Sequence, residues 1–404
     1  MKIAVISRPL PPSPSGQAVM LYRLLKDVDP GQYCLISGAD EEPATAGNSA
    51  QRLPAKYFFL STKGEYLQSQ ATLFQDSVNI TAGTLRRARQ IARIIKAEQC
   101  QAVLSCSSGD DRLDVPAGLL ASRLAHVPFY LYLFDTYAHM WIQPRSRFIG
   151  RRLEPVVVKR AAGVITTNDF VHQMLHERYG VDSLVIHNPC DLSAYETPVP
   201  AAAESNEIRI VYTGAVYDAH YEAFRNLIAA IRLLANPDLR IHIFTAQPRS
   251  LLVARGVTGP VTIHQHEPVA AMPTIQRQAD FLFLPLSFKT PYPELIRVSS
   301  PSKIGEYLAA RRPILVHAPP DSFIATYFRR HDCGLVVDQN DPTVLARALE
   351  KILVDKELQT RLIANAWQRA QADFSLNAAR SKFARFLQLD DGRSQTTTTA
   401  GRHP

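Results

Sequence analysis

The sequence predicts an α/β protein made of two doubly wound domains in tandem, each a mostly parallel sheet with helices on both faces. Short apolar runs rich in β-branched residues alternate with amphipathic helical patterns almost from end to end. The alternation stops near residue 196 and begins again near residue 208. A length of 404 residues suits two domains of similar size.

The first half contains six strand candidates separated by helical segments. The strands are expected at residues 3–7, 33–37, 102–105, 129–134, 163–167 and 184–187. Amphipathic helices are expected at residues 17–28, 85–98, 115–125 and 170–179. Strands spaced by helices of this length form parallel βαβ units. We therefore expect a first domain over residues 1–195.

A segment rich in proline and alanine at 196–207 has no apolar period and is expected to be a linker. Strands then follow at 208–212, 240–244, 261–264, 281–285, 313–317 and 334–337. Helices are expected at 223–234, 268–278, 301–310, 342–354 and from 356 to beyond 380. We expect a second domain over 208–375, a helix at 376–388 packing back on the first domain, and a disordered tail at 389–404.

Composition excludes several classes of protein. With 46% hydrophobic and 20% charged residues, the chain is neither disordered nor fibrous. Its longest apolar stretches are far shorter than the ~20 residues that span a bilayer, and the start lacks the apolar core of a secretion signal. We expect a cytoplasmic protein whose five cysteines, which form no CxxC pair, stay reduced. The net charge of +8 fits nucleic acid, an anionic membrane surface or phosphorylated small molecules.

A proline-rich loop after the first strand ends at Gly16, where a helix begins. A glycine at such a turn lets backbone N–H groups approach an anion at the helix N-terminus. The loop has neither a GxGxxG pattern nor a Walker lysine. An ordinary loop in which the glycine only starts the helix therefore remains an alternative.

The sharper candidate is the Ser-Ser-Pro-Ser-Lys segment of the second half. Ser300 suits an N-cap and Pro301 the first helical position, so we expect a helix to begin here. The free N–H groups, with the Ser302 hydroxyl and the Lys303 ammonium, would bind an anion. Glu306 shares a helix face with Lys303, and its carboxylate can accept hydrogen bonds from vicinal hydroxyls. A nucleoside diphosphate needs such an arrangement; a surface ion pair is the alternative.

Several segments, in this order and spacing, resemble the GT-B glycosyltransferases of the family 4 type (glycosyl transferases group 1). Besides the opening strand and loop, they are ITTNDF (165–170), VIHNPCD (185–191), IVYTG (210–214), ADFLFLP (279–285) and PSKIGEYLAARRPIL (301–315). The resemblance implies two Rossmann-like domains facing across a cleft. It also implies a hexosyl-type transferase that moves a sugar from a nucleotide diphosphate sugar to a hydroxyl, with retention and without a metal cofactor.

Only the second glutamate of the family's Glu-x7-Glu motif is present in this sequence. Glu306 matches the second glutamate, which holds the nucleotide ribose, whereas the first falls on Val298. The resemblance therefore implies donor contacts from the backbone at Ser299, Ser300 and Ser302. It gives Lys303 a catalytic role at the leaving diphosphate.

The family's phosphate motif is also incomplete. Gly214 matches its glycine, but Ala215 stands at the arginine position and the lysine is missing. Arg225 in the following helix and Arg297 before the Pro-Ser-Lys turn are the two candidates to replace it.

Three further residues complete the implied site. Gly16 matches the loop glycine that lies against the donor diphosphate. Asp135 falls where the family often has a His-Asp pair facing the acceptor, so we assign it a catalytic role. His266 follows a strand that lies near the nucleotide base in this fold; a loop histidine that bonds locally is the alternative.

Two basic segments of the first half, 85–98 and 145–160, carry arginines among apolar and aromatic residues. Such a surface suits anionic lipid headgroups, and lipid-linked or saccharide acceptors are common for transferases of this type. We expect peripheral binding at the inner face of the cell membrane through Arg86, Arg87, Arg93, Arg147, Arg151 and Arg152. A solvated basic face is the alternative. A nucleic-acid partner is not expected, because no recognised module is present.

Two other functions stay open beside a transferase of polysaccharide or glycolipid biosynthesis. A GT-B epimerase acting on a UDP-N-acetylhexosamine would need acid and base side chains at the sugar, and no compelling carboxylate–histidine set is visible. A degenerate transferase that binds a nucleotide or a partner without turnover is motivated by Val298 and Ala215.

Overall fold

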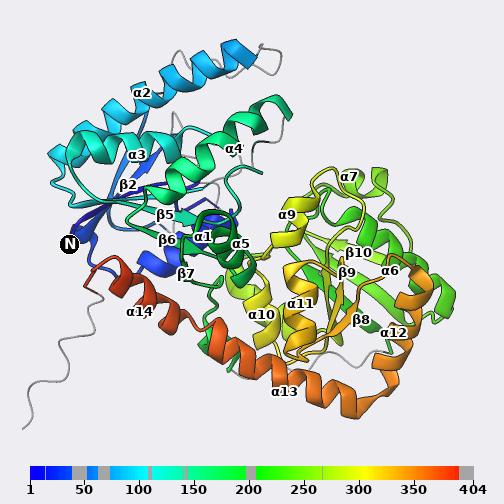
Figure 1. Ribbon diagram of the computed structural model, residues 1–404. Coiled ribbons are helices and arrows are strands. Elements are labelled where there is room, and N and C mark those ends of the chain that lie inside the picture. Colours follow the sequence, from blue (N-terminus) through cyan, green and yellow to red (C-terminus); the bar gives the residue numbers. More distant parts are fainter. Residues whose placement is uncertain are drawn as a thin grey trace, which may run out of the picture. The chain divides into compact units, whose positions relative to one another are not determined.

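The structure is a computed structural model with two compact units, Met1–His187 together with Leu376–Pro404, and Asn188–Ser375 (Figure 1). Each unit is built around one parallel sheet. The described residues are 1–13, 15–38, 52–61, 73–107, 112–139, 141, 144–196, 206–265 and 267–390.

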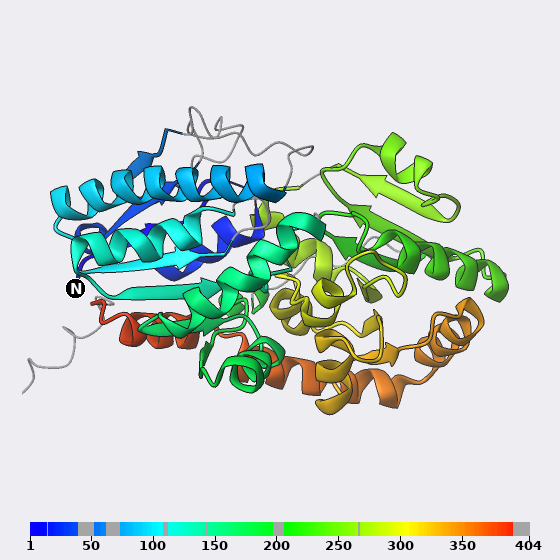
Figure 2. The ribbon, with the colours of Figure 1, turned by 45° about the horizontal axis from the view of Figure 1, so that its top comes forward.

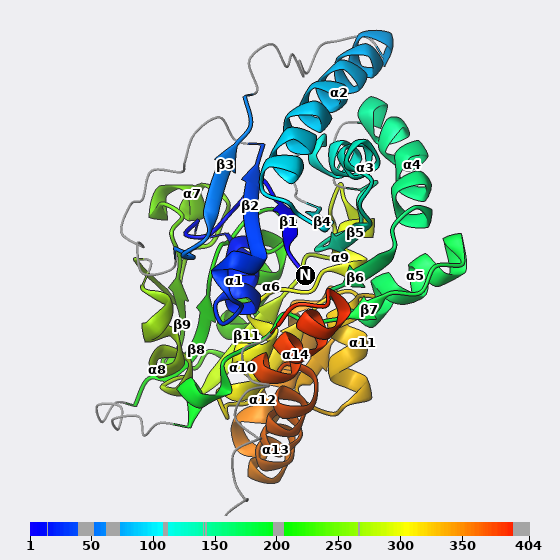
Figure 3. The same ribbon diagram turned by 90° about the vertical axis from the view of Figure 1, so that its left-hand side faces the viewer.

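The first unit has a parallel sheet in the order β3-β2-β1-β4-β5-β6-β7, which can be followed across Figure 3. Its strands are β1 (Ile3–Ile6), β2 (Tyr33–Ser37), β3 (Lys56–Phe59), β4 (Ala102–Cys106), β5 (Phe129–Leu133), β6 (Gly163–Thr166) and β7 (Leu184–Val185). The order turns around at β1, which has β2 on one side and β4 on the other. Ligands of such sheets bind at the carboxyl ends of the strands near this switch point.

Helices cover both faces of the first sheet (Figure 2). One face carries α2 (Leu73–Ala97), α3 (Asp114–Ala125) and α4 (Pro144–Lys159), and α5 (Asp169–Tyr179) packs beside β6 and β7. The opposite face carries α1 (Gly16–Leu25) and α14 (Leu376–Phe386). Phe383 of α14 is fully buried in the same core as Leu21 of α1 and Val5 of β1. The last helix therefore belongs to the first unit.

One arginine of the expected membrane surface is not on the surface. Arg87 points into the first unit, where its Nη1 lies 2.6 Å from Oδ1 of Asp114 and the two side chains are 4% and 1% exposed. Its charge is neutralised inside the protein, so the expectation that Arg87 contacts lipid is wrong. The neighbouring Arg86 and Arg93 of α2 are exposed.

The second unit has a parallel sheet in the order β10-β9-β8-β11-β12-β13, which turns around at β8. Its strands are β8 (Ile208–Thr213), β9 (Leu239–Phe244), β10 (Val261–His264), β11 (Phe281–Pro285), β12 (Ile314–His317) and β13 (Leu335–Val337). The helices are α6 (Tyr221–Leu234), α7 (Arg249–Ala254), α8 (Met272–Arg277), α9 (Pro293–Val298), α10 (Ile304–Ala309), α11 (Phe323–Arg330), α12 (Pro342–Val354) and α13 (Lys356–Asp373). Phe224 of α6 and Leu345 of α12 share one core with Tyr212 of β8.

The boundary between the units lies at His187, earlier than the expected residue 195. Asn188 Nδ2 donates to the Ser300 carbonyl at 2.7 Å, and Cys190 N donates to the Phe374 carbonyl at 2.8 Å. These hydrogen bonds attach the segment after β7 to the second unit. Most of the expected linker (197–205) and most of the expected tail (391–404) lie outside the described residues.

Candidate functional site

The centre of the candidate site is the carboxyl end of β8, at the switch point of the second sheet. The strand ends at Thr213, and Gly214 follows with a φ of 114°. A Cβ on Gly214 would lie 3.1 Å from Lys303 Nζ, so a side chain there would crowd the ammonium. The glycine serves both the left-handed backbone and the close approach of Lys303.

Lys303, just before α10, projects its ammonium onto Tyr212. Its Nζ donates a hydrogen bond to the Tyr212 hydroxyl at 2.6 Å and lies 3.9 Å from the centroid of the phenol ring. The Tyr212 hydroxyl in turn donates to the Ala215 carbonyl at 2.6 Å. Desolvation lowers the pKa of Lys303 to about 7, although the charge of Glu306 acts the other way. The neutral phenol does not cancel the charge of the ammonium, and an incoming anion would favour the charged form.

The carboxylate of Glu306 lies one helical turn further along and is hydrogen-bonded to a buried amide. Gln276 of α8 donates from Nε2 to Glu306 Oε2 at 3.3 Å and to Thr213 Oγ1 at 3.1 Å. Its Oε1 accepts from the hydroxyl of Tyr195 at 2.6 Å. Because a phenol O–H donates to the amide oxygen, the amide NH₂ must face the carboxylate. Gln276 thus orients Glu306.

Tyr307, next in α10, attaches the helix to the end of β8. Its hydroxyl accepts from the Thr213 backbone N–H at 2.9 Å, and its side chain is fully buried. Lys303, Glu306 and Tyr307 are spaced i, i+3, i+4, so one side of this segment faces the strand end. The sequence predicted no role for these supporting residues. Gln276 and Tyr195 are isolated there, without a motif, whereas Tyr212 and Tyr307 lie within the segments 210–214 and 301–315 but were not singled out.

The helix begins later than the sequence predicts. α10 starts at Ile304 with Lys303 in the cap position, and no side chain caps it. The Ile304 N–H donates to the Pro301 carbonyl at 3.1 Å, so residues 301–304 form a turn. The prediction of Ser300 as N-cap is therefore wrong. Its carbonyl accepts from Asn188, and its buried hydroxyl has no hydrogen-bond partner among the described residues.

The other residues predicted before α10 lie in different surroundings. Ser299 ends α9, where its N–H donates to the Ile296 carbonyl at 3.2 Å, and Ser302 is half-buried in the turn. Arg297 is exposed on α9. Val298 is only 7% exposed, so an apolar side chain is buried where the family motif has its first glutamate.

Arg225 and His266 are not joined to this cluster. Arg225 is exposed on α6, where its Nη1 donates to the Arg255 carbonyl at 2.9 Å. His266 lies outside the described residues. The nearby His264 is hydrogen-bonded to His242 at 2.9 Å and stacks on Phe244 with ring centroids 4.2 Å apart.

Gly16 and Asp135 both lie at the carboxyl edge of the first sheet. Gly16 is the first residue of α1, and the N-cap Ser15 accepts from the Ala18 N–H at 3.2 Å. Asp135 follows β5, and its carbonyl accepts from the Ser107 hydroxyl at 3.2 Å. Desolvation raises the pKa of Asp135 to about 6. This carboxylate is thus a stronger base than that of an ordinary aspartate.

The described residues contain neither a metal site nor a membrane-spanning helix. Within them, no group of three or more His, Cys, Asp or Glu side chains could hold a metal ion. No helix in this part of the chain is both long and apolar enough to cross a membrane.

We expect Gln276→Leu to lower the free energy of unfolding by about 2–3 kcal/mol, because it leaves the buried Tyr195 and Thr213 hydroxyls without their amide partner. Urea denaturation measures the change. Gln371→Leu, an exposed position on α13, is the matched control and should change stability by less than about 0.5 kcal/mol. Equal stability of the two variants would contradict the network.

Residues 207–355 match the family model described as glycosyl transferases group 1. No curated protein matches the sequence. Among solved structures, sucrose-phosphate synthase from Thermosynechococcus elongatus has a TM-score of 0.69 at 14% identity, covering 96% of this chain and 98% of its own. Anabaena HepE in complex with UDP and glucose has a TM-score of 0.66 at 14% identity, covering 96% and 99%.

A third similar structure is a putative UDP-N-acetylglucosamine 2-epimerase from Listeria monocytogenes. Its TM-score is 0.58 at 15% identity, covering 96% of this chain and 98% of its own. The fold is therefore shared along nearly the whole chain, and more closely with the two proteins above. Residues 207–355 thus match the model of glycosyl transferases group 1, and nearly the whole chain has the GT-B fold of these solved structures.

Proposed function

We propose that this glycosyltransferase moves a sugar from a nucleotide diphosphate sugar to a hydroxyl group of a saccharide or lipid-linked acceptor. The observation that carries the proposal is the pair formed by Lys303 and Glu306 at the carboxyl end of β8. The Lys303 ammonium would bind the diphosphate, and the Glu306 carboxylate, one helical turn later, would bind the ribose hydroxyls. The UDP and glucose named for the HepE structure support a donor of this class.

Lys303 would stabilise the departing diphosphate electrostatically. Its pKa of about 7 reflects desolvation, and a diphosphate beside it would favour the charged form. Negative charge on the leaving group grows in the transition state, so the ammonium binds that state more tightly than the ground state. Gly214 leaves room for this contact.

The serines before α10 would contribute backbone and hydroxyl contacts to the donor. The buried Ser300 hydroxyl has no partner among the described residues, which suits a donor atom of the ligand. Ser299 and Ser302 flank it in the chain. No metal cofactor is proposed.

Three further residues are proposed to bind the donor, and they differ in their surroundings. Arg297 is exposed, so its guanidinium is free to turn toward a phosphate. Arg225 would have to give up the Arg255 carbonyl to do so. His266 is proposed near the nucleotide base from the resemblance alone.

On the acceptor side we propose Gly16 and Asp135. The raised pKa of Asp135, about 6, makes its carboxylate a better proton acceptor for a hydroxyl nucleophile than an ordinary aspartate. If the enzyme follows its family, the anomeric configuration is retained. Assembly of a cell-surface polysaccharide or glycolipid is the pathway class that we propose.

Calorimetry with UDP-, GDP- and ADP-sugars tests the proposal. At least one donor should bind the intact protein, and Glu306→Ala should weaken that binding. Glu350→Ala, at an exposed position of α12, is the matched control and should bind like the unmodified protein. No binding of any donor by the folded protein would overturn the proposal.

An epimerase is the second candidate, favoured by the similarity to the Listeria protein. Incubating the bound donor without acceptor and following its anomeric NMR signals separates the two, since only an epimerase yields a new sugar. A degenerate binding protein is the third, because Val298 buries an apolar side chain at a motif position. Tight binding without transfer or hydrolysis over a broad acceptor panel would favour it.

We further propose that the first unit docks on anionic membrane. Exposed arginines and an exposed aromatic ring occur on each of α2 and α4, which cover the same face of the sheet (Figure 2). They are Arg86, Arg89 and Arg93 with Phe74 on α2, and Arg151 and Arg152 with Phe148 on α4. Arg152 lies 4.7 Å from the Phe148 ring centroid.

The double variant Arg151→Glu/Arg152→Glu should reduce binding to anionic vesicles at least 10-fold, because each basic residue contributes roughly 1 kcal/mol at such a surface. Vesicle sedimentation at low salt measures it. Binding must also weaken at 1 M salt, where the Debye length falls to ~3 Å. Equal pelleting with neutral vesicles, or none at low salt, would rule the surface out.

A further inference from the structure

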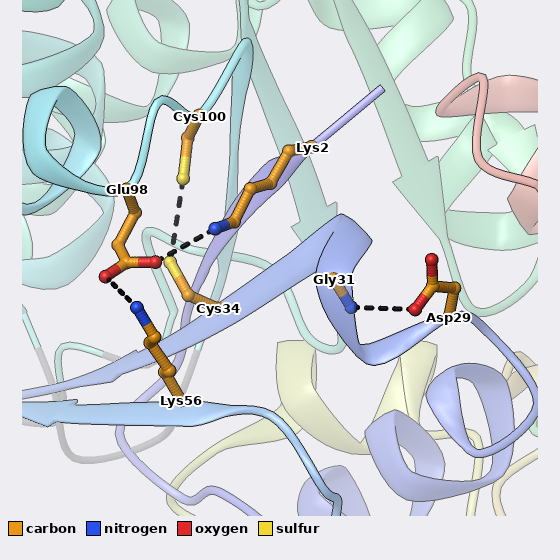
Figure 4. A network of polar contacts seen from close by, with 7 residues as sticks. All are labelled: Lys2, Asp29, Gly31, Cys34, Lys56, Glu98 and Cys100. Carbon is orange, nitrogen blue, oxygen red and sulfur yellow. Dashed lines mark hydrogen bonds and ion pairs between the residues drawn. The ribbon is translucent and has the colours of Figure 1, made fainter.

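Two cysteines far apart in the sequence face each other at the amino edge of the first sheet (Figure 4). Cys34 is the second residue of β2, and Cys100 lies just before β4. Their Sγ atoms are 3.6 Å apart, and the residues are 0% and 5% exposed. Two thiols at this distance need only small side-chain movements to bond.

The charges beside this pair are arranged around Glu98. The Glu98 carboxylate binds Lys2 Nζ at 2.9 Å and Lys56 Nζ at 2.8 Å, and these side chains surround the sulfur atoms in Figure 4. The hydrogen bond with Cys34, together with the positive charge of Lys2, lowers the pKa of the Cys100 thiol. The same hydrogen bond and burial raise the pKa of Cys34. Cys100 is therefore the more nucleophilic sulfur.

The other three cysteines lack these features. Cys106, Cys190 and Cys333 are buried and form no disulfide in the described part of the chain. Burial raises the pKa of Cys106, and it raises that of Cys333 to about 12, so both stay protonated and unreactive. They serve as internal controls.

We propose that Cys34 and Cys100 are a redox-active dithiol that a hydroperoxide converts to a reversible disulfide. The Cys100 thiolate attacks the peroxide, an S–O bond forms, the O–O bond breaks, and the leaving hydroxide takes up a proton to become water. The Cys34 sulfur then attacks the sulfenic acid, the S–O bond breaks, and the hydroxide leaves as water with the Cys34 proton. In sum, two thiols and one hydrogen peroxide give one disulfide and two waters.

The bond would connect β2 to the turn between α2 and β4. Both cysteines lie at the amino edge of the sheet, whereas Gly16 and Asp135 lie at its carboxyl edge. Closing a loop between residues 66 positions apart restricts the unfolded chain. Oxidation should therefore stabilise the first unit without altering the residues proposed for the acceptor side.

Peptide mapping of the full chain after hydrogen peroxide treatment and alkylation is the test. We expect a peptide pair joined through Cys34 and Cys100, about 2 Da lighter than the two thiols, that dithiothreitol separates again. The oxidised protein should melt about 5–10 °C higher than the reduced protein. No crosslink, or a crosslink through other cysteines in protein with unchanged circular dichroism, would overturn the proposal.

Single variants separate the two thiols. In Cys34→Ser the Cys100 sulfenic acid has no partner, so dimedone should label Cys100, whereas in Cys100→Ser the labelling of Cys34 should be at least 10-fold lower. Cys333→Ser is the matched control and should still form the crosslink. Equal labelling of both single variants would contradict the assignment of Cys100 as the attacking sulfur.

Discussion

Lys303→Ala should lower turnover by about 10²- to 10³-fold while the dissociation constant of the donor changes by only a few-fold. The ammonium is desolvated and hydrogen-bonded to a neutral phenol, so its attraction to an anion beside it is only weakly screened. Its contribution grows as negative charge develops on the leaving diphosphate. Steady-state kinetics with the donor identified by calorimetry measure the change.

The control for this prediction is Lys351→Ala, an exposed lysine on α12 that should leave both parameters unchanged. A Lys303→Ala enzyme with normal turnover would show that the proposed donor site is wrong even though the fold is right. A large loss of donor affinity with unchanged turnover would instead assign Lys303 to ground-state binding.

The pH dependence of the same lysine gives a second readout of the first prediction. In the free enzyme Lys303 has a pKa of about 7, so kcat/KM should fall as the pH rises through 7 and the ammonium is lost. Bound diphosphate raises that pKa, so kcat should hold to higher pH. The groups that face Lys303 are Glu306, Tyr212 and His220; desolvation and the positive charge of Lys303 lower the pKa of His220, so it stays neutral.

Glu306→Ala should weaken donor binding about 10- to 150-fold, equivalent to roughly 1.5–3 kcal/mol, because charge-assisted hydrogen bonds to the ribose are lost. The contact is made in both ground and transition states, so KM should rise while kcat changes little. Calorimetry and kinetics measure the two effects. Glu306→Gln keeps the shape of the side chain but not its charge. Its affinity for the donor should lie between those of the unmodified enzyme and Glu306→Ala.

A donor analogue without the 2′ and 3′ hydroxyls provides the control for Glu306. The unmodified enzyme and Glu306→Ala should bind this analogue with equal affinity, because the hydroxyls that Glu306 binds are absent. An analogue that still distinguishes the two proteins would contradict the ribose assignment.

The sequence predicted the architecture well where one signal dominated. Buried parallel strands have continuous apolar runs, which predicted both sheets. It missed the elements with mixed signals. β3 is a four-residue edge strand that contains an exposed Lys56, and α4 carries Pro155 in its interior. The expected helix from residue 356 onward is divided between α13 and α14, and only α14 belongs to the first unit.

For the candidate site, the sequence by itself predicted the residues that lie in motifs, namely Gly214, Lys303 and Glu306, because they are close in sequence to strand or helix ends. Only the tertiary structure could show that Gln276 of α8 binds Glu306, that Tyr195 holds Gln276, and that Tyr212 of β8 accepts from Lys303. The structure also shows that Ser300 does not cap α10 and that Arg87 is not a surface cation. Secondary-structure propensity reflects only the preference of a local segment. The burial of a side chain and its polar partners depend on residues far away in the chain, such as Asn188 for Ser300 and Asp114 for Arg87.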